Sequence, residues 1–323
     1  MKRWLALPSP MMGISRFRKC CRLSVKFPRI AQSIESVASA VRIRWMPIPL
    51  KPRRLSGRFL GLLTIPMAIS MAISVMIVVL AGCATSPTGR NQLLVFPAAQ
   101  LDAMGVQAFE EMRTQLTVET DPAINDYVHC VATAITNELP DKSTNWEVVV
   151  FKDENPNAFA LPGGKMGVYT GMLKVAENQD QLAAVLGHEV GHVLAQHGNE
   201  RISQQQLTDV ALAVAAESGY LDTASMQALG LGAQIGILLP YSRGHESEAD
   251  VIGLDLMADA GFDPRQSVQL WKNMDKAGSG APPEFLSTHP AGSTRIDNLL
   301  SHMADALHTY NDAHAKGKKP VCR

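Results

Sequence analysis

The stretch "ENQDQLAAVLGHEVGHVLAQHG", Glu177 to Gly198, predicts a buried helix that carries two histidines and a glutamate. Within "HEVGH", His188 and His192 are four residues apart, so on a helix both imidazoles leave one face and can bind one metal ion. Glu189 lies beside them and can reach a water at the metal. Burial is indicated by the apolar residues Leu182, Val185, Leu186, Val190, Val193 and Leu194. The alternative is a core helix with two hydrogen-bonded histidines.

Two glycines interrupt the same helix. Gly187 and Gly191 each cost about 1 kcal/mol relative to alanine in a helix interior. Two such costs beside two histidines indicate either close packing of another element or a functional site.

A third metal ligand is needed, because catalytic zinc usually takes three protein ligands and keeps one position for water. The spacing HExxHxxGxxH would supply it nearby, but Ala195 and Gly198 stand where that pattern needs Gly and His. His197 is one residue off, and we interpret it as a structural or surface residue. The third ligand must therefore come from further along the chain.

The stretch "YSRGHESEADVIG", Tyr241 to Gly253, offers that ligand. On a helix, Glu246 and Asp250 fall on the apolar stripe, which comprises Ala249, Gly253, Leu256, Met257 and Ala260. A carboxylate that faces a core must be paired or bind a metal. Glu246 therefore fits the third ligand. Asp250, one helical turn after Glu246, fits a residue that accepts a hydrogen bond from a ligand histidine.

Other interpretations of this stretch stay open. His245 is a rival ligand, and Glu246 with Asp250 could be partly solvated acids near a helix start. Glu248 aligns with Asp255 and Asp259 on the polar side, so we expect it to face solvent and to take no part in the site.

Strands and further helices complete an α+β plan. "WEVVVF", Trp146 to Phe151, predicts a buried strand, and "NAFALPGGKMGVYTGML", from Asn157, predicts a strand, a Gly-Gly turn and another strand. Two helices precede them, one apolar at Leu101, Met104, Phe109, Met112 and Leu116, the other opening at Asp121 and Pro122. Nearly everything after residue 177 is expected to be helical, which gives a mostly helical domain with a small sheet.

The N-terminal part has the composition of an export signal. Residues 1–82 carry 14 Lys/Arg and one acid, whereas residues 83–323 carry 16 Lys/Arg and 29 acids. An apolar run from Phe59 ends in "LAGC", Leu80 to Cys83, which resembles the lipobox of bacterial lipoproteins, with Cys83 as the lipidated residue. The alternative is an uncleaved membrane helix that ends in an unmodified cysteine. Ala84 after the cysteine favours the outer membrane by the same resemblance.

Three segments follow: a leader and signal at 1–82, the lipidated cysteine and a polar tether at 83–97, and one domain at 98–323. Residues 1–45 show no globular pattern and point to a start assigned too early. Cys130 and Cys322 remain in the exported domain, where two leftover cysteines favour a disulfide. The acidic remainder argues against nucleic acid as a partner.

Four motifs together resemble a known family. "LGHEVGHVLAQHG", "YSRGHESEADVIGLDLM", "NPNAFALPGGKMGVYTGML" and "STHPAGSTRIDNL" look like the zinc metallopeptidases of the HtpX and CAAX prenyl protease family. The similarity is greatest to its soluble branch, the LoiP and BepA envelope lipoproteins and the mitochondrial OMA-type proteases. The resemblance covers most of residues 98–305. It implies a gluzincin-like fold, one Zn²⁺ held by His188, His192 and Glu246, and Glu189 as the catalytic acid/base.

Substrate contacts are expected at two further places. "NAFA" (Asn157, Ala158, Phe159 and Ala160) would be an edge strand beside the active-site helix that pairs with an extended substrate, unless it is an ordinary core strand. His289 and Arg295 of "THPAGSTR" are candidate donors to the oxyanion. His289 could instead bind the zinc and hold the enzyme closed, and "THPAGSTR" could be a plain turn at a helix start.

The expected function is a zinc endopeptidase of the bacterial envelope that removes misfolded or misassembled proteins. The alternative is an envelope chaperone or assembly factor that uses the same cleft for binding. Expected partners are unfolded or misfolded envelope proteins and the membrane, through the lipid anchor, with the outer-membrane assembly machinery as a further candidate. The expected location is the outer membrane, facing the periplasm.

Overall fold

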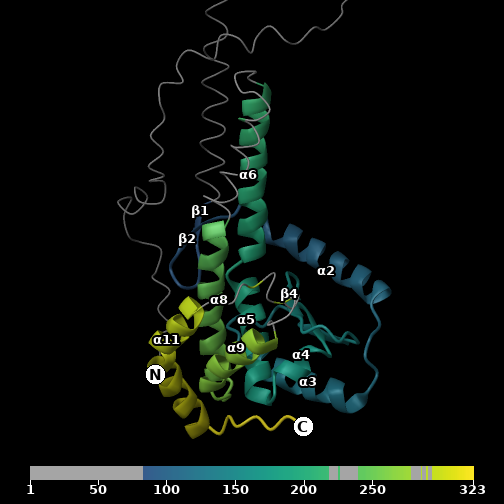
Figure 1. The fold of residues 1–323 in the computed structure, drawn as a ribbon, viewed down its shortest axis with the longest axis vertical. Coiled ribbons are helices and arrows are strands. Elements are labelled where there is room, and N and C mark those ends of the chain that lie inside the picture. The colour runs from purple at the N-terminus through teal and green to yellow at the C-terminus, as the bar shows by residue number, and fades with distance from the viewer. Residues whose placement is uncertain (1–82, 218–224, 226–238, 278–284, 286–288, 290–292) are drawn as a thin grey trace, which may run out of the picture. The chain divides into compact units, whose positions relative to one another are not determined.

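The computed structural model describes residues 83–217, 225, 239–277, 285, 289 and 293–323 (Figure 1). The predicted leader and signal, residues 1–82, lie outside the described residues. The chain divides into two units, Met1–Ala84 and Thr85–Arg323. Within the described ranges, no helix is both long and apolar enough to cross a membrane.

The architecture is α+β and mostly helical, which confirms the predicted class. The strands are β1 (Cys83–Thr85), β2 (Asn91–Leu93), β3 (Glu147–Phe151), β4 (Ala158–Leu161) and β5 (Lys165–Tyr169). The helices are α2 (Ala98–Gln115), α3 (Pro122–Thr136), α4 (Met172–Val175), α5 (Gln179–Leu194), α6 (His197–Glu217), α8 (Leu239–Asp259), α9 (Arg265–Ala277) and α11 (Ser293–Ala315). The segment 83–97, expected to be a polar tether, thus contains two strands that pair as a small second sheet.

The main sheet has the order β3-β5-β4 and presents β4 at its edge. β3 and β5 run parallel, whereas β4 and β5 form an antiparallel hairpin with Ala158 opposite Val168. Gly163 and Gly164 make the turn with φ angles of 81° and 72°, which glycine adopts without strain. The predicted hairpin and edge strand are confirmed, and β4 contacts α5.

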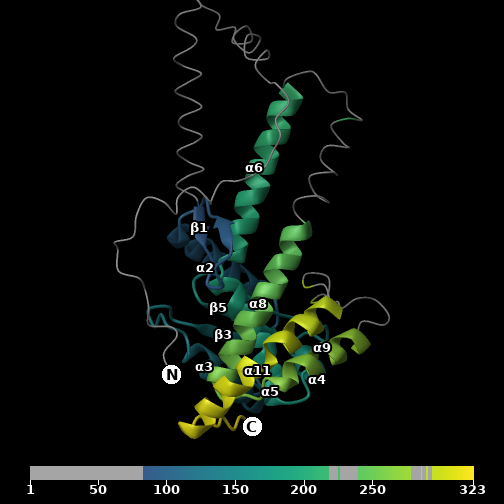
Figure 2. The ribbon, with the colours of Figure 1, turned by 90° about the vertical axis from the view of Figure 1, so that its left-hand side faces the viewer.

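α5 is the centre of the helical part (Figures 1 and 2). It contacts α3, α8, α9 and β4, and every side chain from Gln181 to Gly191 is buried. The Asn178 side chain accepts hydrogen bonds from the main chain of Asp180 and Gln181, which fixes the first turn. A helix buried on all sides has no solvated face, so its polar residues must find partners in the core.

Glycines bring α5 and α8 into backbone contact. A Cβ atom at Gly187 would lie 2.8 Å from the carbonyl oxygen of Gly253, and one at Gly253 would lie 2.6 Å from the nitrogen of His188. At Gly191 it would lie 3.0 Å from the oxygen of Ala249. The close packing explains the two glycines of "HEVGH", and it brings the acids of α8 up to the histidines of α5.

The prediction for the polar side of α8 is wrong. Glu248 is only 6% exposed, and Asp255 and Asp259 are partly buried. The reason is that α11 packs along α8 beside α5 (Figure 2), while Thr88 and Arg90 cover Glu248. The apolar stripe marked one buried face correctly but could not show that the opposite face is covered too. On α2, Met104 is 49% exposed and is likewise not the core residue that its spacing predicted.

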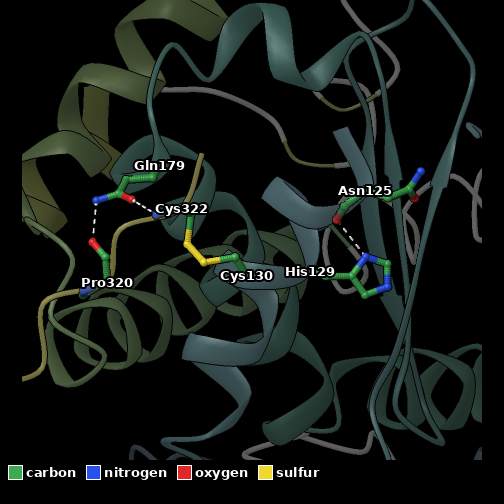
Figure 3. The surroundings of a disulfide bond; sticks show 6 residues. All are labelled: Asn125, His129, Cys130, Gln179, Pro320 and Cys322. Carbon is green, nitrogen blue, oxygen red and sulfur yellow. Dashed lines mark hydrogen bonds between the residues drawn. A yellow bond between two sulfur atoms is a disulfide. The ribbon is translucent and has the colours of Figure 1, made fainter. Parts of the chain in front are cut away.

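The C-terminal tail is joined to α3 (Figure 3). Cys130 and Cys322 form a disulfide across a sequence separation of 192 residues, with their Cα atoms 5.6 Å apart. Gln179, the first residue of α5, accepts from the Cys322 main-chain nitrogen at 2.8 Å and donates to the Pro320 oxygen at 3.0 Å. The tail therefore fastens the start of the helix that carries the histidines.

We expect loss of this disulfide to lower the free energy of unfolding by about 2–5 kcal/mol, because it closes a very long loop of the unfolded chain. Urea denaturation of unreduced protein, against a Cys130→Ser/Cys322→Ser variant, measures the difference. Peptide mapping of unreduced protein after alkylation provides the control. Alkylation of both cysteines without prior reduction would contradict the pairing.

Candidate active site

The two histidines of α5 point their Nε2 atoms at one spot. These atoms are 3.0 Å apart, and His188 and His192 lie one helical turn apart on the same face, as their spacing predicted. His188 is 3% exposed, and the side chain of His192 is 16% exposed on the cavity side.

Glu246 reaches the same spot from α8. Its Oε2 atom lies 3.4 Å from His188 Nε2, and its Oε1 atom lies 3.5 Å from His192 Nε2. Helical spacing predicted that Glu246 faces the core, and in the structure its side chain lies beside both histidines. His245, the rival ligand, instead contacts Glu200 with its Nε2 atom at 3.0 Å.

His289 lies at a fourth corner of this group. Its Nδ1 atom is 3.0 Å from Glu246 Oε2 and 3.2 Å from His188 Nε2. One ligand atom from each of His188, His192, Glu246 and His289 lies within 4.8 Å of the others.

These distances fit a zinc ion. Nitrogen and oxygen ligands about 2.0–2.1 Å from a tetrahedral zinc are roughly 3.3–3.4 Å from one another. The atom pairs above are separated by 3.0–3.5 Å, close to the edges of that tetrahedron. The cofactor is zinc, which His188, His192 and Glu246 would hold, with His289 at the position that a catalytic site otherwise leaves for water.

Asp250 and Arg295 contact His188 on the side of the ring that faces away from the metal position. The Nδ1 atom of His188 is 3.0 Å from Asp250 Oδ1, so its Nε2 atom is left for the metal. Arg295 donates to both oxygens of Asp250, from Nε at 2.7 Å and from Nη2 at 2.6 Å, and lies over the ring of Trp271. Arg295, a candidate oxyanion donor, is 4% exposed; its Nε and Nη2 atoms are bound to Asp250, and its Nη1 atom lies 3.1 Å from Glu246 Oε2.

The acids around His188 change its protonation in the metal-free protein. Burial alone would lower the pKa of His188, but the hydrogen bonds to Asp250 and Glu246 outweigh it and raise the pKa to about 9. Burial also lowers the pKa of His192 well below its usual value, while His188 and His289 hold the pKa of Glu246 far below its usual value against the effect of burial. Near neutral pH, His188 is thus the ligand that must lose a proton when zinc binds.

We expect zinc binding at pH 7–8 to release about one proton, and the apparent affinity to rise about tenfold per pH unit until pH 9. The sign follows because protons compete with zinc for His188 below its pKa and no longer do so above it. Titration calorimetry in buffers of different ionisation enthalpy counts the protons. An affinity that levels off near pH 6.5, as for an unperturbed histidine, would contradict the expected competition.

Glu189 is placed as an acid/base. It is 3% exposed, its Oε1 atom lies 3.5 Å from His289 Nε2, and that oxygen has no hydrogen-bond partner among the described residues. Burial raises the pKa of Glu189, against the lowering by His289 and His188 and by a hydrogen bond from the main chain of Ala160. A carboxylate that is less acidic than usual is suited to take up and return a proton near neutral pH.

A cavity of about 550 Å³ opens in front of these groups. It is lined by residues of β4 and its flanks, from Asn157 to Pro162, together with Glu189, His192, Glu246 and His289. The predicted substrate strand therefore does line the site. Asn157 is 9% exposed, and its carbonyl oxygen accepts from the main chain of Tyr169, so its main chain is committed to the sheet.

Sequence reasoning missed a second polar group next to the histidines. His197 is buried and contacts His192, and Glu248 contacts His197 and Arg90. The partners of Glu248 are 51 and 158 residues away in the sequence, so no local spacing could have revealed them. His197 is 4% exposed, so the alternative that it is a surface residue is wrong.

We expect His289→Ala to increase the rate of peptide cleavage several-fold, because His289 occupies the corner that water and substrate need. Steady-state kinetics with a short peptide measure the change, with His302→Ala on α11 as a control. Loss of about 100-fold or more in rate would instead show that His289 stabilises the oxyanion, as the sequence also allowed.

An HExxH helix, a glutamate from a second helix and a flanking edge strand together define a zinc metallopeptidase. The profile of Peptidase family M48 matches residues 121–303, and the chain belongs to this family.

Three relatives illustrate the similarity. The mitochondrial metalloendopeptidase OMA1 of Schizosaccharomyces pombe is 42% identical over 163 residues, which cover 50% of this chain and 48% of the relative. Metalloendopeptidase OMA1 of Homo sapiens is 32% identical over 239 residues, 68% of this chain and 45% of the relative. The beta-barrel assembly-enhancing protease of Escherichia coli is 27% identical over 202 residues, 60% of this chain and 42% of the relative. The chain thus spans about half the length of the curated relatives that it matches.

Proposed function

We propose that this zinc metallopeptidase is an endopeptidase of the bacterial cell envelope that degrades misfolded or misassembled envelope proteins. The observation that carries the proposal is the edge strand β4, which lines the cavity beside Glu189 and His192. An edge strand binds an extended peptide through main-chain hydrogen bonds and so selects unfolded chain rather than one sequence. The name of the Escherichia coli relative, a protease of β-barrel assembly, supports this setting and makes the outer-membrane assembly machinery a proposed partner.

Each group of the site has a separate role in the reaction. When bound, zinc polarises the scissile carbonyl and makes water more acidic. Glu189 takes the proton of the attacking water and passes it to the leaving amine. β4 holds the substrate main chain, and Asp250 keeps His188 in the orientation that the metal needs.

The substrate class is tested with one protein offered in two states. A disulfide-bonded protein is incubated in its folded form and in its reduced, alkylated and unfolded form. We expect fragments from the unfolded form only. Fragments from both forms at equal rates would contradict selection of unfolded chain. Prevention of aggregation by the protein without any fragments would favour the chaperone alternative.

The envelope location rests on the lipobox-like "LAGC" that ends at Cys83. We propose that Cys83 is the lipidated N-terminus, which anchors the protein to the outer membrane on its periplasmic side. Mass spectrometry of protein extracted from native membranes identifies the first residue and its modification. A chain that still carries residues N-terminal to Cys83 would support the uncleaved anchor instead.

A further inference from the structure

The second histidine ligand, His192, is followed by its own series of hydrogen-bonded side chains. Its Nε2 atom faces His188 and Glu246, while its Nδ1 atom lies 2.8 Å from the Nδ1 atom of His197. The Nε2 atom of His197 lies 3.1 Å from Glu248 Oε2. His197 and Glu248 are 4% and 6% exposed, so both groups depend on protein partners and not on water.

One order of donors and acceptors along these side chains leaves the Nε2 atom of His192 free to bind the metal. An ionised carboxylate only accepts, so the Nε2 atom of His197 carries a proton and donates it to Glu248. When His192 binds the metal through Nε2, its remaining ring proton is on Nδ1, so the Nδ1 atom of His197, 2.8 Å away, is left as the acceptor. The Nδ1 atom of His192 must then be the donor, and the lone pair of its Nε2 atom points at the metal position.

Residues Thr88 and Arg90 hold Glu248, the last side chain of this hydrogen-bonded series. Arg90 donates from Nε to Glu248 Oε2 at 2.7 Å, and Thr88 donates to Glu248 Oε1. Arg90 also pairs with Glu200 through both terminal nitrogens, at 2.9 and 2.7 Å. The charge of Glu248 is therefore fixed in place by residues that precede β2, about 100 residues before the metal ligands in the sequence.

The arrangement repeats the one at His188. There, Asp250 accepts from the ligand histidine and is itself bound by Arg295. At His192, Glu248 accepts through His197 and is itself bound by Arg90. Each ligand histidine thus has a buried carboxylate behind it, and each carboxylate has an arginine, although the two sets come from different parts of the chain.

We propose that His197 and Glu248, anchored by Arg90, are positioning residues of the zinc centre, which fix the tautomer and the ring orientation of His192. The proposal concerns the zinc centre alone and does not depend on the substrate or the location proposed above. Partners behind a ligand histidine typically contribute 10–100-fold to metal affinity. The segment 85–93 then belongs functionally to the metal centre.

The competing explanation is a buried ion-pair cluster that stabilises the fold without touching the metal. The two explanations predict different effects on the zinc dissociation constant. A purely structural role changes the unfolding transition of the metal-free protein and leaves the zinc dissociation constant of the folded protein unchanged. A positioning role changes the zinc dissociation constant even in variants that fold normally.

Four variants of the full chain test the proposal: His197→Phe, which keeps a ring without nitrogens, Glu248→Gln, their combination, and Arg90→Gln. Glu119→Gln is the matched control, since Glu119 is also a buried, hydrogen-bonded glutamate but lies outside the metal cluster and the cavity. Zinc dissociation constants come from competition with a chromogenic chelator, and circular dichroism verifies folding. The visible spectrum of the cobalt-substituted protein reports on the ligand geometry.

We expect His197→Phe and Glu248→Gln each to weaken zinc binding about 10–100-fold and to shift the cobalt spectrum. The double variant should be no weaker than His197→Phe, because Glu248 acts through that ring. Arg90→Gln, whose side chain is only partly buried, should weaken binding several-fold without a loss of folding. An unchanged zinc dissociation constant in folded His197→Phe or Arg90→Gln, or additive losses in the double variant, would overturn the proposal.

Discussion

Glu189→Gln is expected to lower peptide cleavage about 10²–10⁴-fold while zinc remains bound at one ion per chain. The amide keeps the size of the side chain but cannot accept the proton of the attacking water. Glu189 lies beside the ligand group without belonging to it, so its loss leaves the metal in place. Cleavage of a fluorogenic peptide and elemental analysis of the same sample give both numbers.

The control for this change is Glu111→Gln, the same substitution at an exposed position of α2. It should have no effect on either measurement. Normal turnover by zinc-loaded Glu189→Gln would refute Glu189 as the acid/base and would favour a role in binding alone.

Glu246→Ala is expected to lower zinc affinity by at least 100-fold and to abolish cleavage. Glu246 is the one carboxylate in the ligand group, and it contacts both histidines of α5. Its removal leaves only His188 and His192 of the three ligands, beside Arg295, which repels a cation once Glu246 no longer offsets its charge. Asp250→Ala should weaken zinc about 10–100-fold, because it removes the acceptor for His188 and no ligand.

Asp259→Ala serves as the matched control for Glu246→Ala, since it removes a carboxylate from the same helix more than three turns away. Zinc content after dialysis and chelator competition distinguish the variants. Retention of zinc by Glu246→Ala, at the level of Asp259→Ala, would contradict Glu246 as a metal ligand.

The metal ligands could be predicted because helical spacing decides them. His188 and His192 share a face through their i, i+4 separation, and Glu246 with Asp250 falls on the apolar stripe of α8. The glycines of α5 signalled a close helix contact, which the structure locates at Gly253 and Ala249. The M48 match confirms the family resemblance, which implied that the two helices share one site, and the structure places Glu246 within 3.5 Å of both histidines.

The surroundings of Glu248 could not be predicted in the same way. Periodicity separates the two faces of one helix, but it does not show which segment covers the second face. Glu248 lies on the side predicted to be solvated, and residues 51 to 160 positions away bury it. The hydrogen bond from Arg295 to Asp250 also joins residues that are 45 positions apart in the sequence, so the local sequence "THPAGSTR" could not reveal it.

We expect peptide cleavage to require zinc held by His188, His192 and Glu246. The most direct test of this requirement is to remove the metal from the purified protein with a chelator, return zinc stepwise, and follow cleavage of an unfolded protein. We predict that cleavage stops in the metal-free protein and returns in proportion to zinc, reaching its maximum at one ion per chain. Undiminished cleavage by the metal-free protein would contradict the account.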